Sequence, residues 1–326
     1  MCNVKKQKNK LITLGILVTI ATGIIYIANK IIAMSALFKE MLDEPDGNNY
    51  YHWRFGDIYY RKSGQGAPLL LVHDLSAGGS GYEWKKIENK LNKQYTVYTI
   101  DLLGCGRSDK PKITYTNFIY VQLLCDFVKN VIREKTNVIA SGLSTSFVIM
   151  ACNSNSDLFD KNMLINPPSL VSLNQVPGKN SKMQKFLLEI PILGTMIYHI
   201  LVSRVFTKNL FIEDYYFNPF HVDTDFMESY YEAAHTGDGA GKYLQASITG
   251  KYLNFNILHG LKSINNSTCI IGGKEEPGIL DITEDYLHYN PAIETIIIPK
   301  AKHFPHVEQS ADFLEQVGIY FAPDEY

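Results

Sequence analysis

The chain opens with a long apolar stretch and continues with short apolar runs separated by segments of helical spacing. Residues 11–28 carry no charge, and roughly 20 apolar residues suffice to cross a bilayer as a helix. Further along, runs such as 69–72 are apolar at every position, which is typical of strands buried on both faces of a parallel sheet. The pattern predicts one N-terminal membrane helix followed by an α/β domain.

Strands and helices alternate over most of the remaining chain, after a β-hairpin that turns at Gly56. Such alternation produces a mostly parallel, doubly wound sheet with helices on both faces, and its active site lies beyond the carboxyl ends of the strands. The predicted strands are 50–55, 57–62, 69–73, 96–101, 137–141, 161–165, 268–271 and 295–298, and the predicted helices are 83–92, 117–133, 283–288 and 311–321.

The alternation stops over residues 169–256, where aromatic and aliphatic residues recur at helical spacing. An insertion of this size between two strands of one sheet is most simply a helical cap. The predicted division is a basic cytoplasmic tail (1–10), a transmembrane signal anchor (11–34), a linker (35–49), the first part of the core (50–168), the cap (169–257) and the second part of the core (258–326).

Four lysines, at positions 5, 6, 8 and 10, precede the apolar run. A cleaved signal peptide is the alternative to an anchor, but the run is longer than the usual 7–15 residues, and the cleavage signal at residues 33–35 is weak. The lysines outweigh the mixed charges that follow the run, so the N-terminus is expected in the cytoplasm. We therefore predict a single-pass protein of the cell membrane with its large domain on the extracytoplasmic side.

Composition excludes several classes of protein. The net charge of -2 over 326 residues argues against a nucleic-acid partner, which a strong basic excess would indicate. The five cysteines are scattered without metal-ligand spacing, and they predict neither a metal site nor a disulfide framework. No metal or organic cofactor is predicted.

Residues 137–150 form a short apolar run that passes into a helical pattern through Gly142-Leu143-Ser144-Thr145-Ser146. A buried strand that turns sharply into a helix presents one side chain at the turn and needs small neighbours there. Ser144 is the predicted side chain, and Ser146 stands where the G-x-S-x-G pattern has its second glycine. An ordinary strand-to-helix turn has the same pattern, so the neighbouring motifs must indicate whether Ser144 is a nucleophile.

Those motifs resemble the α/β-hydrolase superfamily from about residue 51 onward. The family's H-G-x loop is similar to His73-Asp74-Leu75, its acid turn is similar to Gly273-Lys274-Glu275-Glu276-Pro277, and its closing histidine motif is similar to 302–308. The D-x-x-G-x-G-x-S turn is matched by residues 101–108. The order of these motifs along the chain is that of the family.

The resemblance implies a role for each residue at the expected site. Ser144 is implied as nucleophile, His303 as general base and then acid, and Glu276 as the carboxylate that orients His303. The backbone N–H groups of Leu75 and Thr145 are implied as the oxyanion hole. A serine nucleophile favours ester-type hydrolysis through an acyl-enzyme over the chemistry of the dehalogenase and epoxide-hydrolase branches, which use a carboxylate nucleophile.

Some assignments have alternatives. Glu275 could replace Glu276 as the acid, and His306 could replace His303, although His306 is more simply a packing or hydrogen-bonding residue. Asp101 and His73 are interpreted as structural. Asp74 departs from the family's glycine, because it places a side chain beside the oxyanion loop.

The sequence therefore predicts a membrane-anchored serine hydrolase that acts on an ester or related acyl bond. The aromatic and aliphatic cap favours a small, hydrophobic acyl substrate, and the lipid bilayer is the second partner. Two other classes remain open. One is a catalytically impaired binding module, suggested by Asp74, and the other is a cofactor-free perhydrolase, a carbon–carbon bond hydrolase or an acyltransferase on the same fold.

Overall fold

The computed structural model describes residues 2–43 and 49–322, with side chains from residue 9 onward. Parts of the predicted tail, linker and second core segment, at residues 1, 44–48 and 323–326, lie outside the described residues. Over the described part, all eight predicted strands are confirmed to within a few residues.

The strands form one eight-stranded sheet in the order β1-β2-β4-β3-β5-β6-β7-β8. β1 and β2 form the predicted hairpin, and β2 pairs antiparallel with β4; every other neighbouring pair is parallel. The fold prediction is therefore confirmed. The strands are β1 (Asn49–Trp53), β2 (Gly56–Ser63), β3 (Ala67–Val72), β4 (Tyr95–Ile100), β5 (Thr136–Ser141), β6 (Phe159–Ile165), β7 (Thr268–Gly273) and β8 (Glu294–Ile298).

Two hydrophobic cores sandwich the sheet, because successive residues of each strand point to opposite faces. Leu70 and Val72 of β3 belong to the larger core, and Leu69 and Leu71 belong to the smaller one. The helices against the larger core are α3 (Asn117–Phe127), α4 (Ser144–Ser154), α11 (Leu258–Ser263) and α12 (Ile279–Tyr289), and those against the smaller one are α2 (Lys85–Leu91) and α14 (Ser310–Tyr320).

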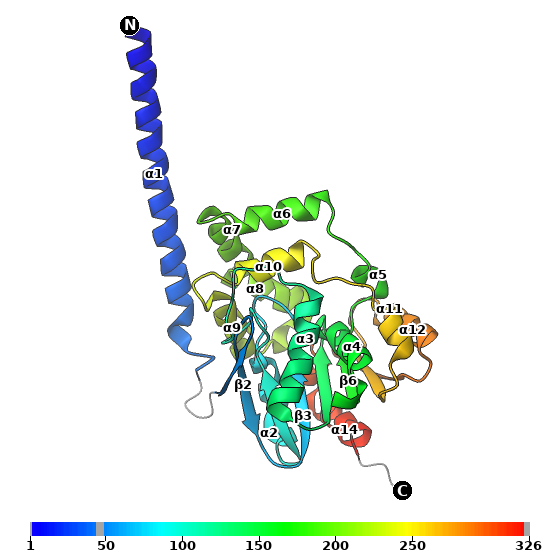
Figure 1. The fold of residues 1–326 in the computed structure, drawn as a ribbon. Coiled ribbons are helices and arrows are strands. Elements are labelled where there is room, and N and C mark those ends of the chain that lie inside the picture. The colour runs from blue at the N-terminus through cyan, green and yellow to red at the C-terminus, as the bar shows by residue number, and fades with distance from the viewer. Residues whose placement is uncertain (1, 44–48, 323–326) are drawn as a thin grey trace.

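The insertion is helical, as predicted, and covers the carboxyl ends of the strands (Figure 1). A short helix, α13 (Pro305–Glu308), lies between β8 and α14. The helices of the insertion are α5 (Leu170–Leu173), α6 (Lys179–Glu189), α7 (Leu193–Leu201), α8 (Arg204–Asn209), α9 (Thr224–His235) and α10 (Lys242–Thr249).

The N-terminal segment is one long helix, α1 (Cys2–Ala36), which projects from the cap side of the molecule (Figure 1). Residues 9–39, which include most of α1 and the short 3-10 helix after it, are long and apolar enough to cross a membrane, with a mean hydropathy of 2.3. Because the side chains of 11–28 are almost all exposed, the apolar run is not the core helix of a globular domain.

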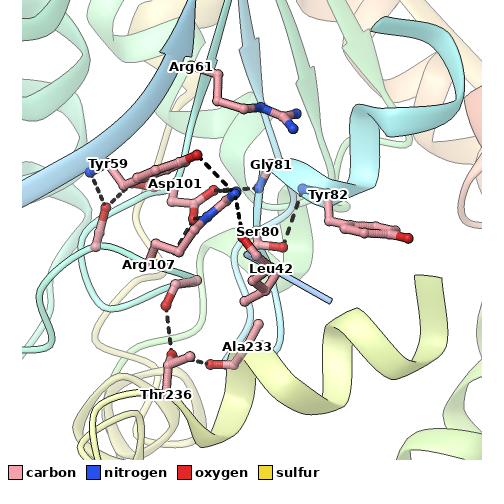
Figure 2. A network of polar contacts seen from close by, with 12 residues as sticks. Leu42, Tyr59, Arg61, Ser80, Gly81, Tyr82, Asp101, Arg107, Ala233 and Thr236 are labelled. Carbon is pink, nitrogen blue, oxygen red and sulfur yellow. Dashed lines mark hydrogen bonds and ion pairs between the residues drawn. The ribbon is translucent and has the colours of Figure 1, made fainter. Parts of the chain in front are cut away.

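A buried ion pair fixes the loop that follows β4 (Figure 2). The Asp101 carboxylate accepts hydrogen bonds from the backbone N–H of Gly81 at 2.6 Å and from the Arg107 side chain at 2.8 Å. Arg107 also donates to the Leu42 carbonyl at 3.2 Å, so the pair ties the segment after α1 to the core. Burial alone would raise the pKa of Asp101, but the charge and hydrogen bonds of Arg107 lower it to about 2. The structural interpretation of Asp101 agrees with these contacts.

Candidate active site

The predicted site residues come from the carboxyl ends of four strands. His73 and Asp74 follow β3, and the strand-to-helix turn at 142–146, which we call the elbow, follows β5. Glu276 follows β7 and His303 follows β8. Parallel strands end at the same edge of a sheet, so the fold gathers these four segments under the cap.

The structure brings His303 and Glu276 together. The Nδ1 of His303 lies 3.2 Å from Oε1 of Glu276. Glu275 instead has an exposed side chain and uses only its backbone N–H, which donates to the Ala301 carbonyl at 2.9 Å. The His303 ring also stacks on Tyr215 of the cap, with ring centroids 4.6 Å apart, so the imidazole is held from two sides.

The elbow differs from its prediction by two residues. Gly142 is the residue with left-handed backbone, at φ +54°, and it joins β5 to the turn before α4. Ser144 is already the first residue of α4, is fully buried, and donates its hydroxyl to the His73 carbonyl at 2.7 Å. The structure therefore does not bring Ser144 to His303. The pattern of small residues also fits residues 140–144, two positions earlier, and there its central residue is Gly142.

Asp74 occupies the space where an elbow side chain would lie. A Cβ atom built on Gly142 would sit 2.1 Å from Oδ1 of Asp74. That oxygen accepts a hydrogen bond from the backbone N–H of Leu143 at 2.8 Å, and Oδ2 lies 3.4 Å from Nε2 of His303. The carboxylate thus lies between the turn at Gly142 and the imidazole of His303, although it comes from the loop after β3.

The two predicted oxyanion donors lie in different places. The backbone N–H of Thr145 donates to the Gly142 carbonyl at 3.2 Å, within the first turn of the helix. Leu75 lies at the wall of the cavity described below. The backbone N–H that is directed at the Asp74 carboxylate is that of Leu143, the residue after the turn.

The charges at this site stabilise one another. Burial alone would lower the pKa of His303, but its hydrogen bonds to Asp74 and Glu276, together with their negative charges, raise that pKa to about 10. Burial would also raise the pKa of Asp74, whereas the hydrogen bond and charge of His303 lower it below its usual value. At neutral pH the imidazole is therefore protonated and faces the ionised Asp74 carboxylate.

A cavity of about 390 Å³ lies between this site and the cap. Asp74 lines it, and the cap contributes mostly apolar side chains from α7 through α10. Two cap tyrosines add polar groups: the Tyr215 and Tyr230 hydroxyls are 3.1 Å apart, and Tyr230 donates to the Ser76 hydroxyl at 2.7 Å. Burial raises the pKa of both tyrosines, so both keep their protons at neutral pH.

The two other histidines near the site make local structural contacts. His73 accepts a hydrogen bond from the backbone N–H of Leu102 at 3.0 Å and contacts the Asp74 carbonyl at 2.7 Å, which agrees with its predicted structural role. His306 is fully buried, stacks on Trp84, and lies 3.2 Å from Glu83. Within residues 2–43 and 49–322, no group of three or more His, Cys, Asp and Glu residues could hold a metal ion.

Sequence reasoning noticed Asp74 but did not assign it a function. The available signal was the pairing of a carboxylate at position 74 with a glycine at position 142. Tyr215 and Tyr230 were seen only as part of an aromatic cap, because no local pattern indicates which aromatic residue of an insertion faces a site.

Comparison with known proteins places the chain among hydrolases. A 74-residue segment is 36% identical to 2-hydroxy-6-oxo-6-(2'-aminophenyl)hexa-2,4-dienoic acid hydrolase of Metapseudomonas resinovorans, covering 22% of this chain and 24% of that protein. A 121-residue segment is 28% identical to a soluble epoxide hydrolase of a Corynebacterium species, covering 37% of this chain and 39% of that one. The matched segments thus span less than half the length of these curated relatives.

Solved structures show the same fold. A serine hydrolase involved in carbazole degradation matches with a TM-score of 0.70 at 19% sequence identity, over 84% of this chain and 98% of that one. At this identity the likeness concerns the fold alone. The model of the alpha/beta hydrolase family matches residues 69–316, more than half of the chain. The chain belongs to the alpha/beta hydrolase family.

Proposed function

We propose that this protein is a membrane-anchored hydrolase of small, apolar molecules and that the Asp74 carboxylate is the group that attacks the substrate. The observation that carries this proposal is the position of Asp74. It is the member of the Asp74, His303 and Glu276 set that lines the cavity under the cap. In addition, a backbone N–H holds one of its oxygens.

A carboxylate held in this way suits attack on a saturated carbon that bears a strained or good leaving group, as in an epoxide. Oδ2 forms a bond to the carbon, and the carbon–oxygen bond of the ring breaks. The hydroxyls of Tyr215, Tyr230 and Ser76 form a chain beside the cavity that supplies a proton to the oxygen that leaves. The product of this step is an ester of Asp74.

The second step removes the ester with water, and the charges of the site supply its base. When Asp74 becomes an ester, its negative charge disappears, and one of the two groups that raise the pKa of His303 is lost. His303 can then release its proton, which restores the tyrosine hydroxyl that gave one up in the first step. The neutral imidazole then accepts a proton from water, while Glu276 continues to hold its ring. Water adds to the ester carbonyl, the diol leaves, and the carboxylate is restored. The net reaction is addition of one water molecule across the carbon–oxygen bond.

The serine mechanism expected from the sequence is the second candidate. The segment 142–146 favours it, because small residues flank Ser144 there. It requires the Ser144 hydroxyl to leave the His73 carbonyl and reach His303, which has Asp74 against its Nε2. The substrate in that case is an ester or related acyl compound with an apolar acyl group.

A single turnover in water enriched in oxygen-18 separates the two candidates. Full-length protein in lipid nanodiscs is mixed with a smaller amount of an aryl epoxide. After the turnover the protein is digested, and its peptides are analysed by mass spectrometry. We expect one heavy oxygen in the peptide that contains Asp74, because water attacks the ester at the carboxyl carbon. The His303→Gln variant should accumulate the ester itself, since it lacks the base for the second step.

Three variants and one probe complete the experiment. Asp74→Asn should abolish turnover, whereas Ser144→Ala should retain it, because the Ser144 hydroxyl contacts only the His73 carbonyl. A fluorophosphonate that labels Ser144 in the parent protein but not in His303→Gln would establish the serine mechanism and refute a role for Asp74 as nucleophile. Absence of label and of turnover, in a protein that still binds apolar ligands, would identify a binding module.

A further inference from the structure

The base of α1 is fastened to the cap. The Asn29 side chain donates to the Ile192 carbonyl at 3.0 Å, and Lys30 forms an ion pair with Asp238. Shortly after the helix, the backbone N–H groups of Met41 and Leu42 donate to Glu232 of α9, at 2.8 and 3.1 Å. These contacts fix the direction of the anchor relative to the cap.

The same contacts also set the level of the cap relative to a bilayer that α1 spans. The uncharged run of α1 covers the 18 residues 11–28 and ends at Asn29. At 1.5 Å per residue this run is about 27 Å long, close to the thickness of a bilayer's hydrocarbon core. Because Asn29 contacts Ile192, between α6 and α7, that corner of the cap lies at the level where the hydrocarbon core ends.

The cap surface at this level is apolar. Figure 1 shows α6 and α7 as the part of the cap that reaches farthest along α1 toward its N-terminus. The helices α6 to α8 expose a set of large apolar side chains, which we call the apolar cap surface: Met183, Phe186, Leu187, Leu193, Ile200, Leu201, Val205 and Phe206.

Exposed cations accompany these side chains. Lys179 and Lys182 lie on α6 and Lys208 lies on α8, whereas Arg204 of α8 forms an ion pair with Glu228 of α9. Apolar residues interleaved with Lys and Arg are typical of helices that lie in the headgroup region of a bilayer, where lipid phosphates neutralise the cations. Contact with a second copy of the same surface would instead bring like charges together.

The cavity reaches the apolar cap surface. Leu201 and Phe206 line the cavity and are also 43% and 51% exposed, so they stand at its mouth. A molecule dissolved in the lipid could therefore pass between α7 and α8 toward Asp74 without crossing bulk water.

We propose that the apolar cap surface rests in the headgroup and upper acyl region of the bilayer around α1, and that the cavity takes its apolar substrate from the lipid phase. This inference rests on the membrane anchoring of α1 proposed above. It goes beyond that proposal because it assigns a second membrane contact and a route for the substrate.

Depth-dependent quenching of tryptophan tests the contact without any assay of activity. Full-length protein is reconstituted into vesicles of phosphatidylcholine and phosphatidylglycerol, with or without bromine on the acyl chains. Three variants each add one tryptophan at an exposed apolar position: Tyr26→Trp on the anchor, Phe186→Trp on the cap, and Ile319→Trp on α14. The parent side chains are 51%, 62% and 65% exposed, and the native Trp53 and Trp84 are buried.

We expect brominated lipid to quench emission from the tryptophans at positions 26 and 186 but not from the one at position 319. Quenching at 26 without quenching at 186 would overturn the cap contact while leaving the anchor intact. No quenching at 26 would overturn both, because the cap contact depends on insertion of α1.

The substrate route has a separate readout. Phe186→Glu should reduce turnover of a substrate dissolved in the vesicles by severalfold and leave turnover of a water-soluble substrate unchanged. An equal reduction of both would refute the route from the lipid. If the parent protein turns over neither substrate, the hydrolase proposal fails, and the quenching result still decides the cap contact.

Discussion

Replacement of Asp74 by asparagine should lower the pKa of His303. Asparagine keeps the shape of the side chain but removes the negative charge that faces Nε2 of the imidazole at 3.4 Å. The ring then has one carboxylate partner, Glu276, in place of two. Its protonated form loses stabilisation, while the burial that favours the neutral form stays the same.

The size of the effect follows from the pKa of His303, which is raised from 6.5 to about 10. At 1.36 kcal/mol per unit, this shift corresponds to about 5 kcal/mol in favour of the imidazolium ion. Burial opposes this shift, so the two carboxylates together contribute more than the net value, and at equal shares the loss of one should lower the pKa of His303 by at least roughly 1.8 units, or about 2.4 kcal/mol. Because the pKa is raised in the folded state, this stability is fully present below about pH 6.5 and is lost as the pH rises toward 10.

The assay is a proton and carbon-13 NMR titration of histidine side chains in full-length protein in detergent micelles, with the His303 signal assigned from His303→Gln. We expect the midpoint for His303 to fall in Asp74→Asn and to stay in place in Ser144→Ala. The reasoning is refuted if Asp74→Asn leaves the midpoint unchanged while Ser144→Ala moves it, because the partner of Nε2 would then be the serine.

Three further results are expected. Asp101→Asn leaves the buried Arg107 without its carboxylate and should lower the free energy of unfolding by about 3–5 kcal/mol in urea titrations, against less than about 1 kcal/mol for Lys135→Gln in an exposed pair. The pKa of Asp101 is lowered from 3.8 to about 2, so its contribution of about 2.5 kcal/mol should be present above pH 4 and disappear as the pH falls toward 2, as acid unfolding would measure. Gly142→Ala should lower the thermal midpoint strongly, and Asp74→Gly should restore only part of the loss in the double variant, because it removes the overlap of the new Cβ with the carboxylate but not the cost of positive φ at position 142.

Most of the fold could be predicted because its signals are local. Strands such as 69–72 are apolar at every position, since parallel strands are covered on both faces. The N-terminal helix was equally visible as an uncharged run of bilayer length. The docking of α1 on the cap could not be predicted, because Asn29, Lys30 and Glu232 meet partners far away in the sequence.

The elbow shows the limit of motif reasoning. Residues 140–144 and 142–146 both place small residues around a central position, and the amino-acid sequence alone does not distinguish the two alignments. The choice depends on which residue has the left-handed backbone, and that residue is Gly142. A positive φ costs an ordinary residue about 1 kcal/mol or more, and glycine adopts it readily, so the chain turns where glycine stands.

Asp74 and Gly142 form one structural unit, and this distinguishes the site from a serine hydrolase that has merely lost its serine. A lost side chain would leave a gap beside His303, and the backbone N–H after the turn would have no acceptor. Here the carboxylate fills the place of the missing side chain and accepts the Leu143 N–H at 2.8 Å. It also supplies the imidazole with a charged partner. Any side chain at position 142 would displace the carboxylate, and any shorter residue at position 74 would leave the N–H unpaired. The glycine and the aspartate therefore depend on each other, which supports the proposal that the carboxylate serves as the nucleophile.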